Sequence, residues 1–192
     1  MRLFLAIEVP GAWRREAARA LRALTAALHD DARPLLRPVA ADRLHLTVRF
    51  LGEVDGALLA PLQAALAGAV PPVAVDLALA PAGSFGPAAR TSVVWLGVGG
   101  DLDGLRTLAA RVDGAVIAAG LALDPREPHE ARPHLTLARV RPRAGAAGRR
   151  AIAHATAALA SPPPLPQRPE QLVLIHSRLT GDGPRYEVLQ RL

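Results

Sequence analysis

The sequence of 192 residues contains no cysteine and no lysine, and only 3% of it is aromatic. Without cysteine there is no disulfide, no zinc–thiolate site and no cysteine nucleophile. Long hydrophobic runs are also missing: the apolar tract over 56–82 is interrupted by prolines and by Asp76, so it does not predict a membrane span. The run over 2–8 is too short before its acidic residue to be a signal-peptide core. We therefore expect a soluble cytoplasmic protein.

All 23 basic residues are arginine, and the formal net charge is +6. A guanidinium group binds phosphate through two parallel hydrogen bonds, so this composition suits a nucleic-acid partner. A GC-rich genome would enrich Arg, Ala, Gly and Pro codons together and would give the same bias. The charge alone does not decide between the two explanations. The length and the 51% of apolar residues are sufficient for a substantial globular core.

The tripeptide His-Leu-Thr occurs twice, at 45–47 and at 134–136. Each copy lies in a segment that is apolar at alternate positions and free of Gly and Pro, which predicts a β-strand. Residues i and i+2 of a strand share a face, so each copy places an imidazole beside a hydroxyl. Two such pairs facing each other supply an acid, a base and two neutral hydrogen-bond donors. Clusters of metal ligands are missing from the sequence, so we expect no metal and no cofactor.

The predicted elements repeat with an offset of 89 residues, the separation of the two histidines. Such a repeat predicts an α+β fold of two pseudo-symmetric β-α-β-α-β halves, with both His-Thr pairs on the walls of one shared cleft. In the first half we expect strands at 3–8, 45–52 and 73–79, helices at 12–28 and after Asp55, and then a Pro/Gly-rich loop at 81–87. In the second half we expect strands at 91–98, around 134–139, 171–177 and 185–192, and helices at 101–120 and 145–159. Asp55 and Asp101 are predicted to be the N-caps of the helices that follow them.

The two motifs in their contexts, 37–54 and 132–139, resemble the 2H phosphoesterase superfamily. Within it they resemble the bacterial and archaeal RNA 2′,3′-cyclic phosphodiesterase branch, first called 2′-5′ RNA ligase. Further similarity at 2–7, 93–97 and 185–186 extends the resemblance over almost the whole chain. It implies a bilobed fold with mainly antiparallel sheets flanking a central, metal-independent cleft. We expect a single domain over 1–192, with lobes formed from pseudo-repeats at about 1–82 and 90–192.

The resemblance also implies hydrolysis of a terminal 2′,3′-cyclic phosphate to a 2′-phosphate. This reaction needs a water that loses a proton as it attacks phosphorus and a leaving oxygen that gains one. Histidine, with an ordinary pKa of about 6.5, serves either role near neutral pH. The resemblance implies that His45 is the acid and His134 the base, although the residues themselves do not separate these roles. The Thr47 and Thr136 hydroxyls are expected to hold the non-bridging phosphate oxygens.

Two arginines follow the motifs at different spacings. The resemblance implies that Arg139, five residues after His134, binds substrate phosphate. Strict alternation would place Arg139 on the opposite face from His134, so a bulge or the strand end must turn it inward. By the same alternation, Arg49 shares the face of His45. Trp95 and Tyr186 are candidates for base stacking, with core packing favoured for Trp95.

We therefore expect a monomeric enzyme that acts on RNA ends with a 2′,3′-cyclic phosphate. One alternative keeps the fold and changes the reaction to cleavage of 2′-5′-linked oligonucleotides, hydrolysis of a small cyclic nucleotide, or the reverse joining of RNA ends. An alternative of another class is a non-catalytic RNA-binding module with an arginine-lined cleft. Two complete His-Thr pairs argue against that module, because a binder does not need a matched acid and base.

Overall fold

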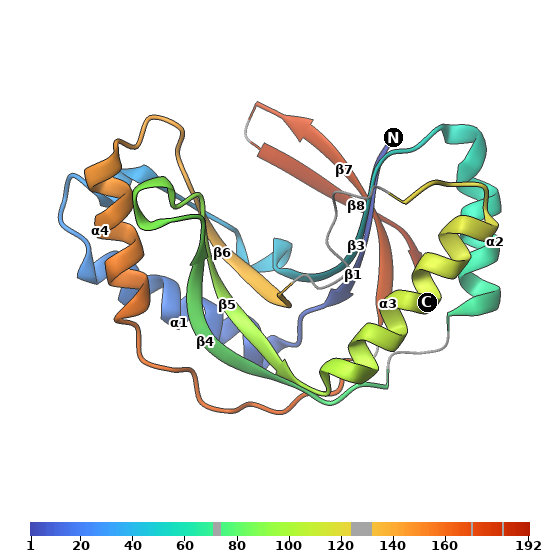
Figure 1. Cartoon of the computed structure of the whole chain (residues 1–192), viewed down its shortest axis with the longest axis horizontal. Coiled ribbons are helices and arrows are strands. Elements are labelled where there is room, and N and C mark those ends of the chain that lie inside the picture. Colours follow the sequence, from blue (N-terminus) through green and yellow to red (C-terminus); the bar gives the residue numbers. More distant parts are fainter. Residues whose placement is uncertain (71–73, 124–131, 170, 182) are drawn as a thin grey trace.

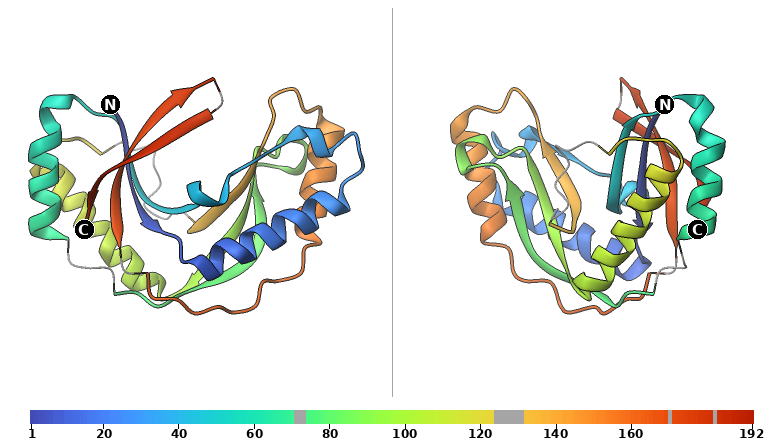
Figure 2. Two further views of the ribbon diagram at one scale, coloured as in Figure 1. Left: turned by 180° about the vertical axis from the view of Figure 1, so that it is seen from behind. Right: turned by 45° about the vertical axis from the view of Figure 1, so that its right-hand side comes forward.

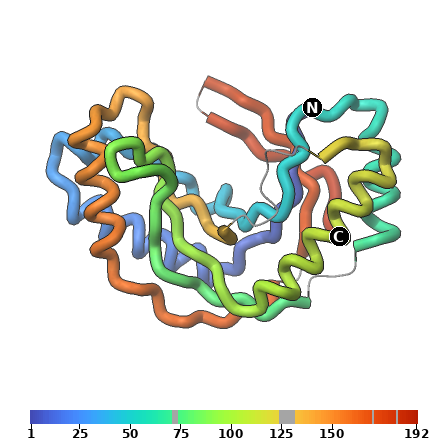
Figure 3. The backbone as a smooth tube through the Cα atoms, viewed as in Figure 1, coloured from blue at the N-terminus to red at the C-terminus, as the bar shows by residue number. Residues whose placement is uncertain are grey.

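The computed structural model describes residues 1–70, 74–123, 132–169, 171–181 and 183–192. Figure 1 shows a molecule with two arms that meet at their base and open toward one side, with both chain termini in the same arm. The views in Figure 2 and the trace in Figure 3 show the β7–β8 hairpin leaning from that arm toward the opening. The predicted α+β fold with two lobes is confirmed.

One eight-stranded sheet runs through both arms in the order β4-β5-β6-β3-β1-β7-β8, with β2 paired to β6. The strand pairs are antiparallel, as predicted. The strands of one arm are β1 (Arg2–Glu8), β3 (His45–Glu53), β7 (Leu172–Thr180) and β8 (Gly183–Arg191). The strands of the other arm are β2 (Leu36–Pro38), β4 (Leu77–Phe85), β5 (Val93–Gly100) and β6 (His134–Val140).

In the described part of the chain, four α-helices cover the outer faces of the arms (Figure 1). The helices α2 (Leu59–Ala69) and α3 (Leu102–Ala118) pack against each other, and α3 contacts β3. On the other arm, α1 (Gly11–Ala27) and α4 (Ala146–Ala157) pack together and contact β6 and β4, respectively. The predicted N-caps are confirmed: the Asp101 carboxylate accepts a hydrogen bond from Gly104 N, and the Asp55 carboxylate accepts one from Ala57 N in the turn before α2. Within the described residues, no helix is long and apolar enough to span a bilayer.

The lobes are not the contiguous halves 1–82 and 90–192 that the repeat predicts. The third strand of each half is exchanged: β4 pairs with β5 of the second half, and β7 pairs with β1 of the first. The physical reason is that β1 and β5 each have one edge left after pairing with β3 and β6, and an open edge is unfavourable. The exchange gives β1 and β5 a neighbour on both edges, and these two strands become buried. From β4 to β7, the strands are the third, first, second, second, first and third of their respective halves. This order is symmetric about the β6–β3 pair, as a pseudo-two-fold axis requires.

The predicted loop at 81–87 is wrong in its first part, because β4 continues to Phe85. Pro81 lies at a register shift of the β4–β5 pair, where its missing N–H does not interrupt the ladder. Glycine is required at position 83, because a Cβ there would collide with the Trp95 indole. The strand predicted at 73–79 begins at Leu77, and position 73 itself lies outside the described residues.

Arg49 does not share the face of His45. The β1–β3 register pairs Ala6 with Thr47 but Leu5 with Arg49, so Val48 is an extra residue and the strand bulges there. The bulge turns Arg49 to the core side, where its Nε and Nη2 donate to the two Asp113 carboxylate oxygens of α3 at 2.6 and 2.5 Å. This bidentate ion pair is buried and joins the motif strand to the helix behind it.

Replacing Asp113 with alanine should lower the free energy of unfolding by about 3–5 kcal/mol, because the buried Arg49 guanidinium then loses its two hydrogen bonds to the Asp113 carboxylate. Urea denaturation measures this loss. The matched control is Asp103→Ala on the same helix, whose ion pair with Arg106 is exposed and should contribute little. Equal effects of the two substitutions would contradict a stabilising role for the buried pair.

Candidate active site

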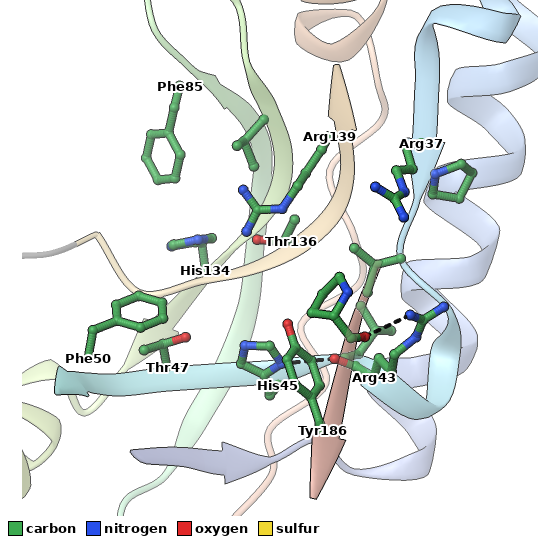
Figure 4. A pocket seen from close by; sticks show the side chains of 15 residues that line it. Arg37, Arg43, His45, Thr47, Phe50, Phe85, His134, Thr136, Arg139 and Tyr186 are labelled. Atoms are coloured by element: carbon green, nitrogen blue, oxygen red, sulfur yellow. Dashed lines mark hydrogen bonds between the residues drawn. The ribbon is translucent and has the colours of Figure 1, made fainter. Parts of the chain in front are cut away.

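The two His-Leu-Thr motifs are brought together by the pairing of Leu46 in β3 with Leu135 in β6. Both leucines are fully buried, so their side chains occupy the core face of the sheet. The histidine and threonine on either side of each leucine therefore occupy the opposite face. Because the strands are antiparallel, each histidine lies beside the threonine of the other motif (Figure 4).

A pocket of about 260 Å³ lies over this pairing and is lined from both arms. All five predicted site residues line it: His45, Thr47, His134, Thr136 and Arg139. The structure thus brings together every residue that the sequence assigned to the site. Within the described part of the chain, no three His, Cys, Asp or Glu side chains gather as a metal site requires.

The two imidazoles have the same backbone contact. His45 Nδ1 lies 2.8 Å from the carbonyl oxygen of Arg43, and His134 Nδ1 lies 2.8 Å from that of Arg132. A carbonyl oxygen only accepts hydrogen bonds, so Nδ1 carries the proton in both rings. Nε2 is then the nitrogen that is free to accept or donate a proton. Both histidines are oriented for acid–base chemistry by contacts two residues back in the chain.

Each imidazole also has one aromatic ring packed edge-to-face against it. Phe85 of β4 lies against His134 with ring centroids 4.8 Å apart and an interplanar angle of 89°. Tyr186 of β8 lies against His45 at 5.2 Å and 87°. These contacts restrict rotation of the imidazoles, because a packed aromatic neighbour limits the accessible ring orientations.

The electrostatic surroundings favour the neutral form of both histidines in the free protein. Burial is the largest cause that lowers the pKa of His45; the hydrogen bond to Arg43 opposes it, and the charges of His134 and Arg139 lower the pKa further. Burial and Arg139 likewise lower the pKa of His134 against the Arg132 hydrogen bond. Burial raises the pKa of the Tyr186 hydroxyl, so it remains a hydrogen-bond donor at neutral pH.

Arg139 reaches the pocket through a second bulge. In the β5–β6 pair, Val94 is opposite Ala138 and Trp95 is opposite Thr136, so Leu137 is an extra residue. Of the two predicted causes, a bulge or the strand end, the structure shows the bulge, which turns the Arg139 side chain to the face of His134. The bulges at Val48 and Leu137 are themselves 89 residues apart, so they belong to the repeat.

Several lining residues were not predicted from the sequence. Arg37 and Arg43 come from the segment before β3, and the Arg43 guanidinium donates to the Pro184 carbonyl at 3.1 Å, which ties this segment to β8. Phe50 and Phe85 also line the pocket. Their segments show no motif, and strict alternation along the strand places Phe50 on the face opposite His45. Trp95 is buried behind the pocket, as its predicted core packing requires.

A two-armed α+β protein with one His-x-Thr pair from each of two paired strands has the arrangement of the 2H phosphoesterases. The chain belongs to the 2′-5′ RNA ligase superfamily, whose family model matches residues 9–181.

Two curated relatives are both named RNA 2′,3′-cyclic phosphodiesterase. The protein of Aeropyrum pernix strain K1 is 32% identical over 106 residues, which cover 55% of this chain and 58% of the relative. The protein of Escherichia coli K12 is 40% identical over 103 residues, which cover 54% of each chain. The match therefore spans little more than half the length of these relatives.

Solved structures match over the whole chain. TT0787 of Thermus thermophilus superposes with a TM-score of 0.72 at 25% identity, covering 100% of this chain and 96% of that one. Escherichia coli LigT complexed with 3′-AMP superposes with a TM-score of 0.71 at 27% identity and the same coverage.

The hydrogen bonds to Arg43 and Arg132 predict that neutral His45 and His134 both carry their proton on Nδ1. Nitrogen NMR of the imidazoles measures this tautomer directly, and a pH titration should give a pKa below about 6.5 for both rings. In urea the preference for Nδ1 should disappear, because the backbone contacts are lost. A proton on Nε2 in the folded protein would contradict the proposed orientation.

Proposed function

We propose that the protein hydrolyses RNA 2′,3′-cyclic phosphate termini to 2′-phosphomonoesters. The observation that carries this proposal is the pair of imidazoles with free Nε2 atoms in one pocket with two threonines and Arg139. The printed name of both curated relatives, RNA 2′,3′-cyclic phosphodiesterase, supports the same reaction.

In the proposed mechanism one neutral imidazole accepts a proton from water at Nε2 while the water oxygen attacks phosphorus. The other imidazole is protonated and donates from Nε2 to the 3′-oxygen as its bond to phosphorus breaks. The phosphate remains on the 2′-oxygen. We take His134 as the base and His45 as the acid, as the family resemblance implies. The contacts of the two rings are too similar to assign these roles by themselves.

The remaining side chains stabilise charge rather than transfer protons. The hydroxyls of Thr47 and Thr136 lie in the pocket beside the opposite histidines, where they can donate to the non-bridging oxygens. Arg139 offsets the negative charge of the phosphate. A bound phosphate also opposes the causes that lower the histidine pKa values, so we expect substrate binding and protonation of one imidazole to be linked.

The proposed partner is an RNA end, bound by one monomer in the cytoplasm, without a metal, a cofactor or a membrane. The residues that line the pocket come from β3 and β8 in one arm and from β4, β5 and β6 in the other, which supports a site formed within one chain. This supports the proposal that 1–192 works as a single domain.

Three alternative reactions use the same geometry: cleavage of 2′-5′ linkages, hydrolysis of a small cyclic nucleotide, and the joining of RNA ends. A non-catalytic RNA-binding module is the alternative of another class. The matched Nδ1 contacts favour an enzyme over the module, because phosphate binding by arginine does not require two imidazoles with defined tautomers.

The test is incubation of an oligonucleotide carrying a 2′,3′-cyclic phosphate with the protein in excess EDTA. We expect a 2′-phosphate product, resolved by chromatography from the 3′-phosphate isomer. A 2′-5′-linked dinucleotide and 2′,3′-cyclic AMP are assayed in parallel to rank the alternatives. Activity that EDTA abolishes and one divalent ion restores would contradict the mechanism. RNA binding that weakens with added salt, without any turnover, would support the non-catalytic RNA-binding module instead.

A further inference from the structure

Charge is distributed unevenly between the two arms. The strands β2, β4, β5 and β6, the helix α4 and their flanking segments lie within 32–41, 77–100 and 132–169. These ranges contain ten arginines and no Asp or Glu, whereas the rest of the chain carries the other 13 arginines and all 17 acidic residues. A codon bias would enrich arginine along the whole chain, but it would not remove carboxylates from one arm. The positive charge of this arm is therefore a local feature of the fold.

Three residues of this arm, Arg139, Arg141 and Arg143, form an arginine row that extends outward from the pocket. Arg139 lines the pocket. The ladder between β2 and β6 continues one step beyond the strand ends, because Arg141 N donates to the Leu35 carbonyl. Arg141 therefore shares the face of Arg139, about 7 Å further along the chain. Figure 1 shows that the segment between β6 and α4, to which Arg143 belongs, lies at the open end of the arm.

The two outer guanidiniums of the row are held by a backbone oxygen and not by a carboxylate. Arg141 Nε and Arg143 Nη2 both donate to the Pro34 carbonyl, at 3.1 and 3.4 Å. Both arginines are exposed, and within the described part of the chain neither forms an ion pair. A guanidinium has five N–H donors, so most donors of each side chain remain available to an anion.

Arg149 of α4 fixes the backbone of the same segment. Its guanidinium donates to four carbonyl oxygens at distances between 2.6 and 3.3 Å, those of Thr91, Arg141, Pro142 and Ala144. A segment that is ordered before binding loses less conformational entropy when a ligand binds. The row is thus an ordered cationic surface that continues from the pocket.

The partner that fits this surface is the phosphodiester backbone of a single RNA strand. The row begins at Arg139, which the proposed mechanism places against the substrate phosphate, and carries a positive charge at every second residue. Proteins bind single strands in positively charged grooves that follow the backbone. An RNA end carries further phosphates upstream of its cyclic phosphate, whereas a cyclic mononucleotide carries none.

We propose that Arg141 and Arg143 bind backbone phosphates of the RNA upstream of its cyclic phosphate end, an inference that rests on the proposed function. The enzyme then acts more efficiently on the ends of RNA chains than on cyclic mononucleotides, because only a chain reaches the outer part of the row. Contacts to phosphates carry no sequence information, so the row provides affinity for RNA of any sequence.

The test compares a uridylate decamer with a 2′,3′-cyclic phosphate end and uridine 2′,3′-cyclic phosphate. At low salt, Arg141→Gln/Arg143→Gln should lower kcat/KM for the decamer roughly 5- to 30-fold, because two phosphate contacts are lost. It should change kcat/KM for the mononucleotide less than about twofold, since both residues lie outside the pocket. The decrease of log kcat/KM for the decamer with log salt should become shallower by about 1.4, at about 0.7 per contact.

The matched control is Arg106→Gln/Arg111→Gln, which removes the same charge from the exposed face of α3 on the other arm. It should leave turnover of the decamer unchanged. Arg141→Lys/Arg143→Lys keeps the charge of the row and should retain most of the preference for the decamer. Equal losses in the two glutamine variants, or an unchanged salt dependence in Arg141→Gln/Arg143→Gln, would overturn the inference.

Binding of a decamer that ends in a 2′-phosphate separates this inference from the proposed function, because it does not require turnover. Fluorescence anisotropy should show weaker binding in Arg141→Gln/Arg143→Gln than in the wild type and in the α3 control. Such binding without turnover of any cyclic phosphate would support the role of the row while contradicting the proposed function. Equal binding by all three proteins would overturn the role of the row, whatever the turnover.

Discussion

The antiparallel contact between Leu46 and Leu135 is the constraint on which the site depends. It joins the two arms and places each histidine beside the threonine of the other motif. A shift of either strand by one residue would turn its histidine into the core and its leucine into the pocket. The buried leucines oppose such a shift, because their exposure would cost about 2 kcal/mol or more each. The packing of these leucines on the core face of the sheet thus fixes the position of the histidines and threonines in the pocket.

The bulges at Val48 and Leu137 explain how a repeated strand gives an asymmetric pocket. Each bulge reverses the alternation after the threonine, so the residue two positions beyond it faces the pocket. In β6 that residue is Arg139; in β3 it is Phe50, while Arg49 is turned back to Asp113. The extra strand β8 adds a second difference by placing Tyr186 against His45. We infer that the symmetric part supplies acid–base chemistry and the differences orient the substrate.

The features predicted from the sequence are those that short segments determine. The motif strands follow from alternation, the caps at Asp55 and Asp101 from local hydrogen bonding, and the five site residues from two repeated motifs and a resemblance. The exchange of β4 and β7 depends on which strand edges of the sheet remain unpaired. That depends on pairing between segments far apart in the sequence, which local patterns do not show. The face of Arg49 and Phe50 depends on the register with β1, which alternation within β3 does not contain.

The central claim is that His45 and His134 act as one acid–base unit. The most direct measurement is kcat of His45→Ala, His134→Ala and the double variant on a 2′,3′-cyclic phosphate end, with His154→Ala on the exposed face of α4 as control. Each single substitution should lower kcat by roughly 10²–10⁴-fold. The double variant should be little worse than the slower single one, because residues of one unit are not additive. Near-wild-type turnover in either single variant would contradict the claim.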